Sequence, residues 1–248
     1  MLKEIKNLLA FLTILPLKMD ADCLIDSAKF MYIFPLIGVL IGLIAGVFAL
    51  AISQVLPSLV VGALAFGLIL LLTGLHHTDG LLDFGDAVMY HGTAERKIEI
   101  MHDQLTGAGA LGLGIMTLLV TAISIGEIRS SLLIPSLIVI ELSAKLSMVV
   151  GAWAGKPVHQ GMNSLFLEKM HGKTGNLRLI AALLISYTVA LPLMLTAGFV
   201  AVTAAIITGL IMVAISHHHF KGVTGDVLGA TNELARMVAL LALLSIIR

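Results

Sequence analysis

Residues 31–55 read MYIFPLIGVLIGLIAGVFALAISQV, a run without Lys, Arg, Asp or Glu. A helix needs about 20 apolar residues to cross a hydrocarbon core roughly 30 Å thick, so this run is long enough to span a membrane. The run belongs to the first of three uncharged stretches, which cover 30–78, 104–126 and 179–220. The sequence therefore predicts an all-α polytopic membrane protein.

The composition supports this fold class. Hydrophobic residues make up 58% of the chain and charged residues 12%, about half the charged share of soluble domains. The formal net charge of zero argues against non-specific binding to nucleic acid, so we expect no nucleic-acid partner. The apolar segment Leu8–Leu17 is too short to span and indicates an interfacial or re-entrant helix.

The pattern predicts about seven transmembrane helices with short interfacial helices, in a single membrane domain covering 1–248. The expected spans are 31–55, 59–75, 109–126, 131–151, 178–196, 199–216 and 232–247. One side then receives the N-terminal segment and the segments 76–108, 152–177 and 217–231. With the adjoining helix ends, that side holds twelve Lys and Arg residues, Arg236 among them, against two on the other side. This imbalance places the polar segments in the cytoplasm.

Two opposite charges lie inside the fourth span. Glu141 and Lys145 are four residues apart and share one helical face. Charges at that depth should face the bundle interior. They form either a buried ion pair that fixes helix packing or part of the lining of a site.

An acidic stripe follows the second span. Asp79, Asp83 and Asp86 are spaced four and three residues apart, on one helical face, and His76 joins the same stripe. Three carboxylates so close repel one another unless a cation lies between them. Oxygen ligands suit Mg²⁺ or Mn²⁺, so the stripe predicts a metal site. The alternative is a solvated helix face, which the Leu-rich flanks disfavour.

Glycines accompany the acidic residues in two segments. Glycine at position 80 lowers helix stability, so we expect it to allow a ligand or a neighbouring helix to approach the backbone closely. In the segment Thr224-Gly225-Asp226, glycine indicates a tightly packed loop. Asp226 is then available for a cation or a hydroxyl group, or it caps a helix.

Two further polar segments are less specific. Glu95, Arg96, Glu99 and Asp103 form a charged stripe that favours an amphipathic surface helix, although Asp103 could face the first acidic stripe. Lys156 and Lys173 lie in a basic segment. That segment is typical of a lipid-facing or positive-inside loop, and its lysines are also candidates for contacting substrate phosphates.

In order along the chain, these motifs resemble those of the cobalamin synthases, also called adenosylcobinamide-GDP ribazoletransferases. The matching residues are Phe11-Leu-Thr-x₂-Pro16, His76-x₂-Asp79-Gly80-x₂-Asp83-x₂-Asp86, Glu99-Ile-Met-x-Asp103-x₃-Gly107 and Thr224-Gly225-Asp226-x₂-Gly229-Ala230. The sequence departs from the family pattern at Lys221, where a second Gly is expected, and at Phe84-Gly85. Neither departure changes an acidic position.

The resemblance implies a late step of cobalamin biosynthesis in the cell membrane, with the active site facing the cytoplasm. A hydroxyl of α-ribazole, or of its 5′-phosphate, attacks the cobinamide-linked phosphorus of adenosylcobinamide-GDP. GMP leaves, and adenosylcobalamin or its phosphate forms. The expected ion is Mg²⁺, the other partner is membrane lipid, and a homo-oligomer remains an open alternative to a monomer.

The same chemistry assigns roles to the acidic residues. Asp79, Asp83 and Asp86 would hold a divalent ion or an ion pair, with Asp103 or Asp226 completing the set. Asp83 or Asp103 would act as the general base. The residues expected to bind substrate are His76, Gly80, Arg96, Lys156, Lys173, Thr224 and Gly225.

Two alternatives to this activity follow from the same residues. A CDP-alcohol phosphotransferase acting on a lipid headgroup would require an Ala-Arg pair three residues after Gly80, which the sequence lacks. An ion-coupled transporter would place its carboxylates near the midplane of the membrane rather than at one face.

Overall fold

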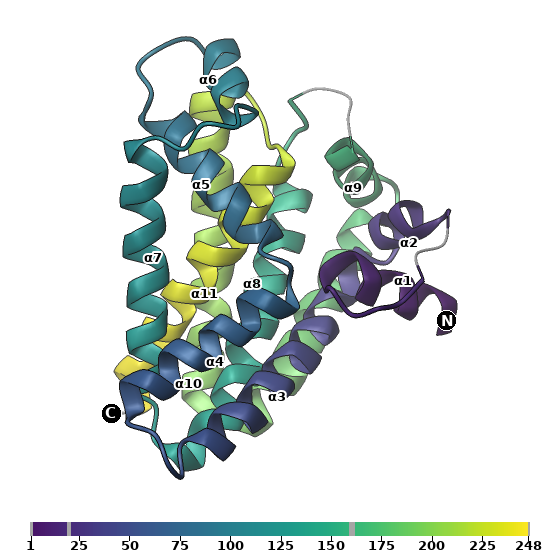
Figure 1. Ribbon diagram of the computed structural model, residues 1–248. Coiled ribbons are helices and arrows are strands. Elements are labelled where there is room, and N and C mark those ends of the chain that lie inside the picture. Colours follow the sequence, from purple (N-terminus) through teal and green to yellow (C-terminus); the bar gives the residue numbers. More distant parts are fainter. Residues whose placement is uncertain (1, 19–20, 159–161, 248) are drawn as a thin grey trace.

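The computed structural model describes residues 2–18, 21–158 and 162–247, and within them it forms eleven α-helices. The long helices pack into one bundle (Figure 1): α3 (Phe34–Ile52), α4 (Ser58–Leu72), α7 (Ala108–Gly126), α8 (Leu133–Ala154), α10 (Gly175–Phe220) and α11 (Gly225–Ile247). The shorter helices are α1 (Leu2–Leu12), α2 (Cys23–Lys29), α5 (His76–Met89), α6 (Ala94–Met101) and α9 (Met162–His171). Two 3₁₀ turns, Met31–Ile33 and Ser130–Leu132, precede α3 and α8.

Helix α10 reverses its direction near its middle. Leu195 has a φ of 48° and a ψ of −124°, which breaks the helical path. The hydroxyl groups of Tyr187 and Thr203 are 3.0 Å apart, whereas 16 residues of straight helix would separate them by about 24 Å. Gly198 also lies against the backbone of Ala190. The two parts of α10 are therefore antiparallel arms of a helical hairpin.

The number of membrane crossings follows from this reversal. In the described residues, five helices are long and apolar enough to cross a membrane, or six if the bent pair α4–α5 is one span. Counting the arms of α10 separately adds one crossing to either number. The predicted all-α bundle is confirmed, but one expected boundary is wrong. Helix α11 begins at Gly225 rather than at residue 232, so most of the expected 217–231 loop is helical.

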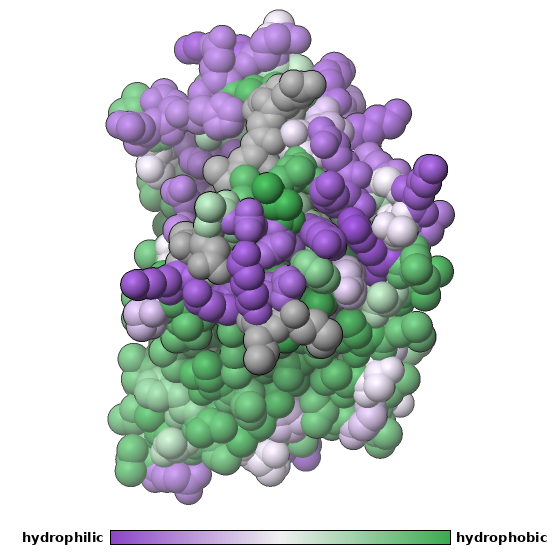
Figure 2. Space-filling model, turned by 90° about the vertical axis from the view of Figure 1, so that its right-hand side faces the viewer, coloured by the Kyte–Doolittle hydropathy of each residue, from purple (hydrophilic) through white to green (hydrophobic). Residues whose placement is uncertain are grey.

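The surface of the molecule is divided between two kinds of side chain. In Figure 2, hydrophobic residues cover the lower half and hydrophilic residues cover most of the upper half. Large apolar side chains are exposed along α3, α7 and α10, as at Val47, Ile115 and Leu184. Helix α6 lies in the upper part of the molecule, whereas the C-terminal end lies low in the bundle (Figure 1). The polar segments between the spans thus gather at one end of the bundle.

A sharp bend after α4 determines the course of α5. Gly74 and Leu75 have φ values of 63° and 60°, a left-handed conformation that glycine adopts readily and leucine rarely. The axes of α4 and α5 differ by 95° as a result. The backbone N–H of Ile14 donates to the carbonyl of Leu72 at 2.8 Å, which ties the N-terminal segment to this bend. Helix α5 then packs against α11 and α7.

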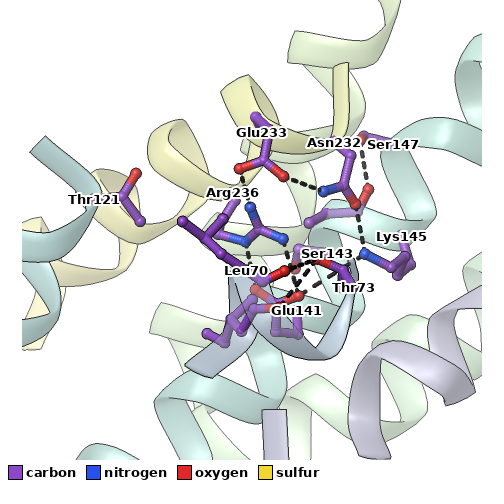
Figure 3. A network of polar contacts seen from close by, with 12 residues as sticks. Leu70, Thr73, Thr121, Glu141, Ser143, Lys145, Ser147, Asn232, Glu233 and Arg236 are labelled. Atoms are coloured by element: carbon purple, nitrogen blue, oxygen red, sulfur yellow. Dashed lines mark hydrogen bonds and ion pairs between the residues drawn. The ribbon is translucent and has the colours of Figure 1, made fainter. Parts of the chain in front are cut away.

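A network of four charged residues holds α8 and α11 together in the interior (Figure 3). The Nε of Arg236 donates to Oε1 of Glu141 at 2.5 Å, and its guanidinium also pairs with Glu233. The Nζ of Lys145 donates to Asn232 at 2.8 Å and lies 3.9 Å from Glu141. All four charged side chains are at most 1% exposed.

This network confirms that Glu141 and Lys145 face the bundle interior. It supports the packing role for the pair, because their partners come from the neighbouring α11. The position of Arg236 differs from the prediction: it is fully buried and does not belong to the charged surface at a helix end. The late start assigned to the last span caused this error, because it placed Arg236 near the end of the helix.

Candidate functional site

The acidic stripe on α5 lies beside the first turn of α11. A Cβ atom on Gly80 would lie 2.9 Å from the Cα of Asp226, so only glycine allows the two backbones to approach this closely. Of the two uses expected for Gly80, the structure shows the close approach of a neighbouring helix. This contact brings Asp226 next to the stripe that carries Asp79 and Asp83.

The carboxylates influence one another electrostatically. Burial, together with the negative charges of Asp79, Asp226 and Asp86, raises the pKa of Asp83 to about 7. Asp83 lies beyond the bend, outside the five helices that are long enough to span. A carboxyl group with this pKa can accept a proton near neutral pH.

The first turn of α11 is capped by Thr224, not by Asp226. The hydroxyl of Thr224 accepts a hydrogen bond from the backbone N–H of Val227 at 3.2 Å, which is the geometry of an N-cap. Asp226 is therefore not the N-cap residue of α11. Its Oδ2 lies 3.8 Å from Nε2 of His102.

Asp86 has a structural role at the start of α7. Its two carboxylate oxygens accept hydrogen bonds from the backbone N–H groups of Gly107, at 2.6 Å, and Ala110, at 2.9 Å. A carboxylate at a helix N-terminus satisfies amides that have no partner within the helix. The carboxylate therefore joins the end of α5 to the start of α7.

Asp103 lies to one side of this group. It is exposed after the end of α6 and lines a hollow of about 350 Å³ together with Asp86. Asp226 lines a different cavity. Asp103 is also not one of the charges that act on the pKa of Asp83.

The predicted substrate-binding residues are spread over the polar end of the bundle. His76 is exposed at the start of α5, and Arg96 is exposed on α6, where it pairs with Glu99 at 2.5 Å. The carbonyl of Lys156 accepts a hydrogen bond from the N–H of Val223 at 2.7 Å, so this residue lies beside the segment before α11. Lys173 is exposed in the turn before α10.

The donors at the site are suited to a hard divalent cation. Asp79, Asp83 and Asp226 offer carboxylate oxygens from two helices. The raised pKa of Asp83 comes first from burial and then from neighbouring negative charges, which a cation would offset. Over the ranges described, no three His, Cys, Asp or Glu side chains already converge closely enough to hold an ion. Binding would therefore require these carboxylates to turn toward one point.

A cavity of about 390 Å³ adjoins the carboxylates. Thr224, Gly225, Asp226 and His102 form one part of its wall. Other lining residues were not identified from the sequence as functional: Phe11, Met31, Phe34, Met148, Phe166 and Leu228. Phe11 could have been found, because it begins the Phe11–Pro16 motif. Met31, Phe34 and Met148 lie in apolar segments, and Phe166 and Leu228 lie in expected polar segments; in neither case does a local pattern mark them as lining a cavity.

Comparison with known proteins identifies related sequences along nearly the whole chain. Residues 4–244 match the family described as cobalamin-5-phosphate synthase. The adenosylcobinamide-GDP ribazoletransferase of Methanococcoides burtonii is 30% identical, over 98% of this chain and 92% of its own length. The proteins of the same name from Methanocella arvoryzae and Archaeoglobus fulgidus are each 33% identical, over 97% and 98% of this chain and 94% and 97% of their own lengths. No solved structure matches the chain.

Proposed function

Because the chain belongs to the cobalamin-5-phosphate synthase family, we propose that it transfers the phosphocobinamide group of adenosylcobinamide-GDP to ribazole and releases GMP. Curated relatives that match over nearly their full length carry both substrates in their names. The reaction belongs to the late part of cobalamin biosynthesis.

The observation that carries the assignment of the site is the meeting of α5 and α11. Asp79 and Asp83 from one helix and Asp226 from the other influence Asp83 as one group, and α5, which carries two of them, lies in the upper part of the bundle (Figure 1). A diphosphate substrate brings negative charge to this point, so the reaction needs carboxylates that can hold a cation and accept a proton.

The transfer makes one phosphorus–oxygen bond and breaks another. A hydroxyl oxygen of the acceptor bonds to the phosphorus that carries cobinamide, and the bond from that phosphorus to the oxygen of GMP breaks. Asp83 is placed to take the hydroxyl proton, since its pKa of about 7 allows it to accept a proton without being permanently protonated. Asp103, the other candidate base, borders a separate hollow, which favours Asp83.

We propose Mg²⁺, or Mn²⁺ in its place, as the ion held by Asp79 and Asp226, with Asp83 only partly engaged by it so that one of its oxygens can take the hydroxyl proton. Such an ion supplies positive charge that stabilises the diphosphate as negative charge develops on GMP. Asp86 can contribute only through lone pairs that remain beside its two backbone hydrogen bonds.

The positive charge of the polar segments supports a site that faces the cytoplasm of the cell membrane. With Arg236 buried, eleven of the twelve Lys and Arg residues counted on that side remain, against two on the other side. The exposed apolar side chains of α3, α7 and α10 would contact membrane lipid.

The family description names a phosphorylated product, which favours ribazole 5′-phosphate as the acceptor. Lys156 lies beside the segment that precedes Asp226, so its exposed ammonium group can neutralise a phosphate of the acceptor or of the leaving GMP. Lys173 is the other lysine available for this role.

The test is GMP release by purified protein in detergent, given adenosylcobinamide-GDP and α-ribazole or its 5′-phosphate. We expect GMP and a cobalamin product with Mg²⁺, and neither with EDTA. Transfer that persists in EDTA would overturn the metal assignment but keep the activity. A well-folded protein that forms no product with either acceptor would overturn the activity and favour a transporter.

A further inference from the structure

Three aromatic rings meet in the 390 Å³ cavity, although they come from distant parts of the chain. Phe11 lies on α1, Phe34 begins α3, and Phe166 lies on α9. The rings of Phe11 and Phe166 are stacked, with centroids 5.3 Å apart and planes 27° apart. Phe34 lies 6.3 Å from Phe11 and 6.2 Å from Phe166. The cavity therefore has an aromatic wall built by tertiary packing.

The polarity of the cavity wall changes from one part to another. Met31, Met148 and Leu228 join the three phenylalanines and complete an apolar part. Thr224, Gly225 and Asp226 form a polar part that adjoins the acidic stripe of α5. A ligand that fills this cavity should have an apolar planar group joined to a group with hydroxyls.

The apolar wall of the cavity is unsuited to two groups of the donor substrate, the guanine base and the corrin macrocycle. Guanine has several hydrogen-bond donors and acceptors on its edges, and they would be left unpaired among phenylalanine, methionine and leucine side chains. The corrin macrocycle with its amide side chains is too large and too polar for a cavity of this volume. The base of ribazole is a methyl-substituted benzimidazole, which is planar and has few polar atoms.

We propose that this cavity binds the base of the acceptor, with the benzimidazole against Phe11 and Phe166, which Phe34 supports from behind, and the ribose toward Asp226. The proposal rests on the proposed function, since it assigns a subsite to one of the two substrates. The cavity then places an acceptor hydroxyl beside the carboxylates, and its aromatic part selects the base. Phe11 thereby links the N-terminal motif to the reaction.

The test compares Phe166→Ala and Phe166→Leu with a matched control, Phe199→Ala. Phe199 is also an aromatic residue in a ring contact, with Tyr187, but it lies on the lipid-exposed side of α10. Because base stacking on an aromatic side chain contributes strongly to binding, we expect Phe166→Ala to raise the KM for the acceptor about tenfold. The KM for adenosylcobinamide-GDP should stay within about twofold. Phe166→Leu keeps the apolar volume, so it should fold and show an intermediate rise.

The base of the acceptor, used alone as a fragment, allows binding to be measured without turnover of the variants. Free 5,6-dimethylbenzimidazole should inhibit competitively against the acceptor and bind directly to the wild-type protein in calorimetry. Its affinity should fall in both Phe166 variants and not in Phe199→Ala. An unchanged acceptor KM, or a rise confined to the donor KM, would overturn the proposal while transfer itself continues. Wild-type protein that binds the fragment but forms no product would overturn the proposed function instead.

Discussion

Two groups of charged side chains, both with members on α11, differ in how far positive charges offset negative ones. The interior network pairs Glu141 and Glu233 with Lys145 and Arg236, and all four are buried. At the polar end, the acidic site gathers Asp79, Asp83, Asp86 and Asp226. Among the described residues, His102 is the one basic side chain within ion-pair distance of this site.

The difference separates a structural role from a chemical one. A buried network whose charges sum to zero satisfies its own groups, and removing one member leaves an uncompensated charge. A half-buried group with excess negative charge depends on a cation or a proton from outside. Hence substitutions in the network should act on stability, and substitutions in the acidic site should act on turnover.

The largest effect is expected for Arg236→Met. Removing this guanidinium leaves two buried carboxylates facing one ammonium group, so the free energy of unfolding should fall by about 3–5 kcal/mol. Unfolding in detergent, followed by circular dichroism, measures the change. Arg129→Met is the matched control, since Arg129 is exposed and its loss should cost less than about 0.5 kcal/mol.

The double variant Glu141→Gln/Arg236→Met sharpens this test. It restores neutrality, because Lys145 and Glu233 remain, so it should recover part of the lost stability. Equal destabilisation by the single and double variants would show that charge balance does not stabilise the network.

The next effect concerns Asp79→Asn and Asp83→Asn. Each should lower the rate of GMP release by about 100-fold or more, because an amide neither takes up a proton nor holds a cation as a carboxylate does. The melting temperature should not fall, since each change removes mutual repulsion. Glu95→Gln, on the exposed face of α6, is the control. Turnover that survives in both Asp variants would contradict the assignment of the site.

A smaller effect is expected for Asp86→Ala, which tests whether Asp86 belongs to the structure or to the site. Loss of the cap of α7 should lower the free energy of unfolding by about 1 kcal/mol. Asp86→Asn keeps a capping oxygen and should preserve most of the stability. If Asp86→Asn also keeps turnover, the residue acts as a cap alone; a loss of turnover at full stability would make it a metal ligand.

The last effect is on the pH dependence of stability without metal, and solvent screening of the partly exposed Asp83 reduces it. The pKa of Asp83 is about 7 in the folded protein, whereas an unfolded Asp titrates near about 3.9. The folded state therefore binds the extra proton between about pH 4 and pH 7, and unfolding free energy should fall as pH rises through that window. Melting scans in EDTA measure this slope. The slope should flatten in Asp83→Asn and persist in Glu95→Gln; identical slopes would show that Asp83 is not its source.

The sequence predicted those features that depend on local spacing. The uncharged stretches indicated the spans, and the spacing of Asp79, Asp83 and Asp86 indicated one helical face, which α5 provides. The i,i+4 spacing of Glu141 and Lys145 indicated that both face the interior. In each case the relevant residues lie within one helix.

The features that were missed depend on contacts between helices. Arg236 pairs with Glu141 across 95 positions of sequence, and the aromatic cavity joins α1, α3 and α9. The i,i+3 spacing of Glu233 and Arg236 was visible, but an expected span start at residue 232 placed both near the surface. The cap formed by Asp86 on α7 likewise depends on where two helices meet.

The neutrality of the interior network has a consequence for the energised membrane. A single elementary charge moved across a membrane potential of 100 mV changes in energy by about 2.3 kcal/mol. Glu141, Lys145, Glu233 and Arg236 sum to zero, so the transmembrane voltage exerts no net force on this part of the protein. A movement of this network within the bundle would therefore carry no net charge across the membrane.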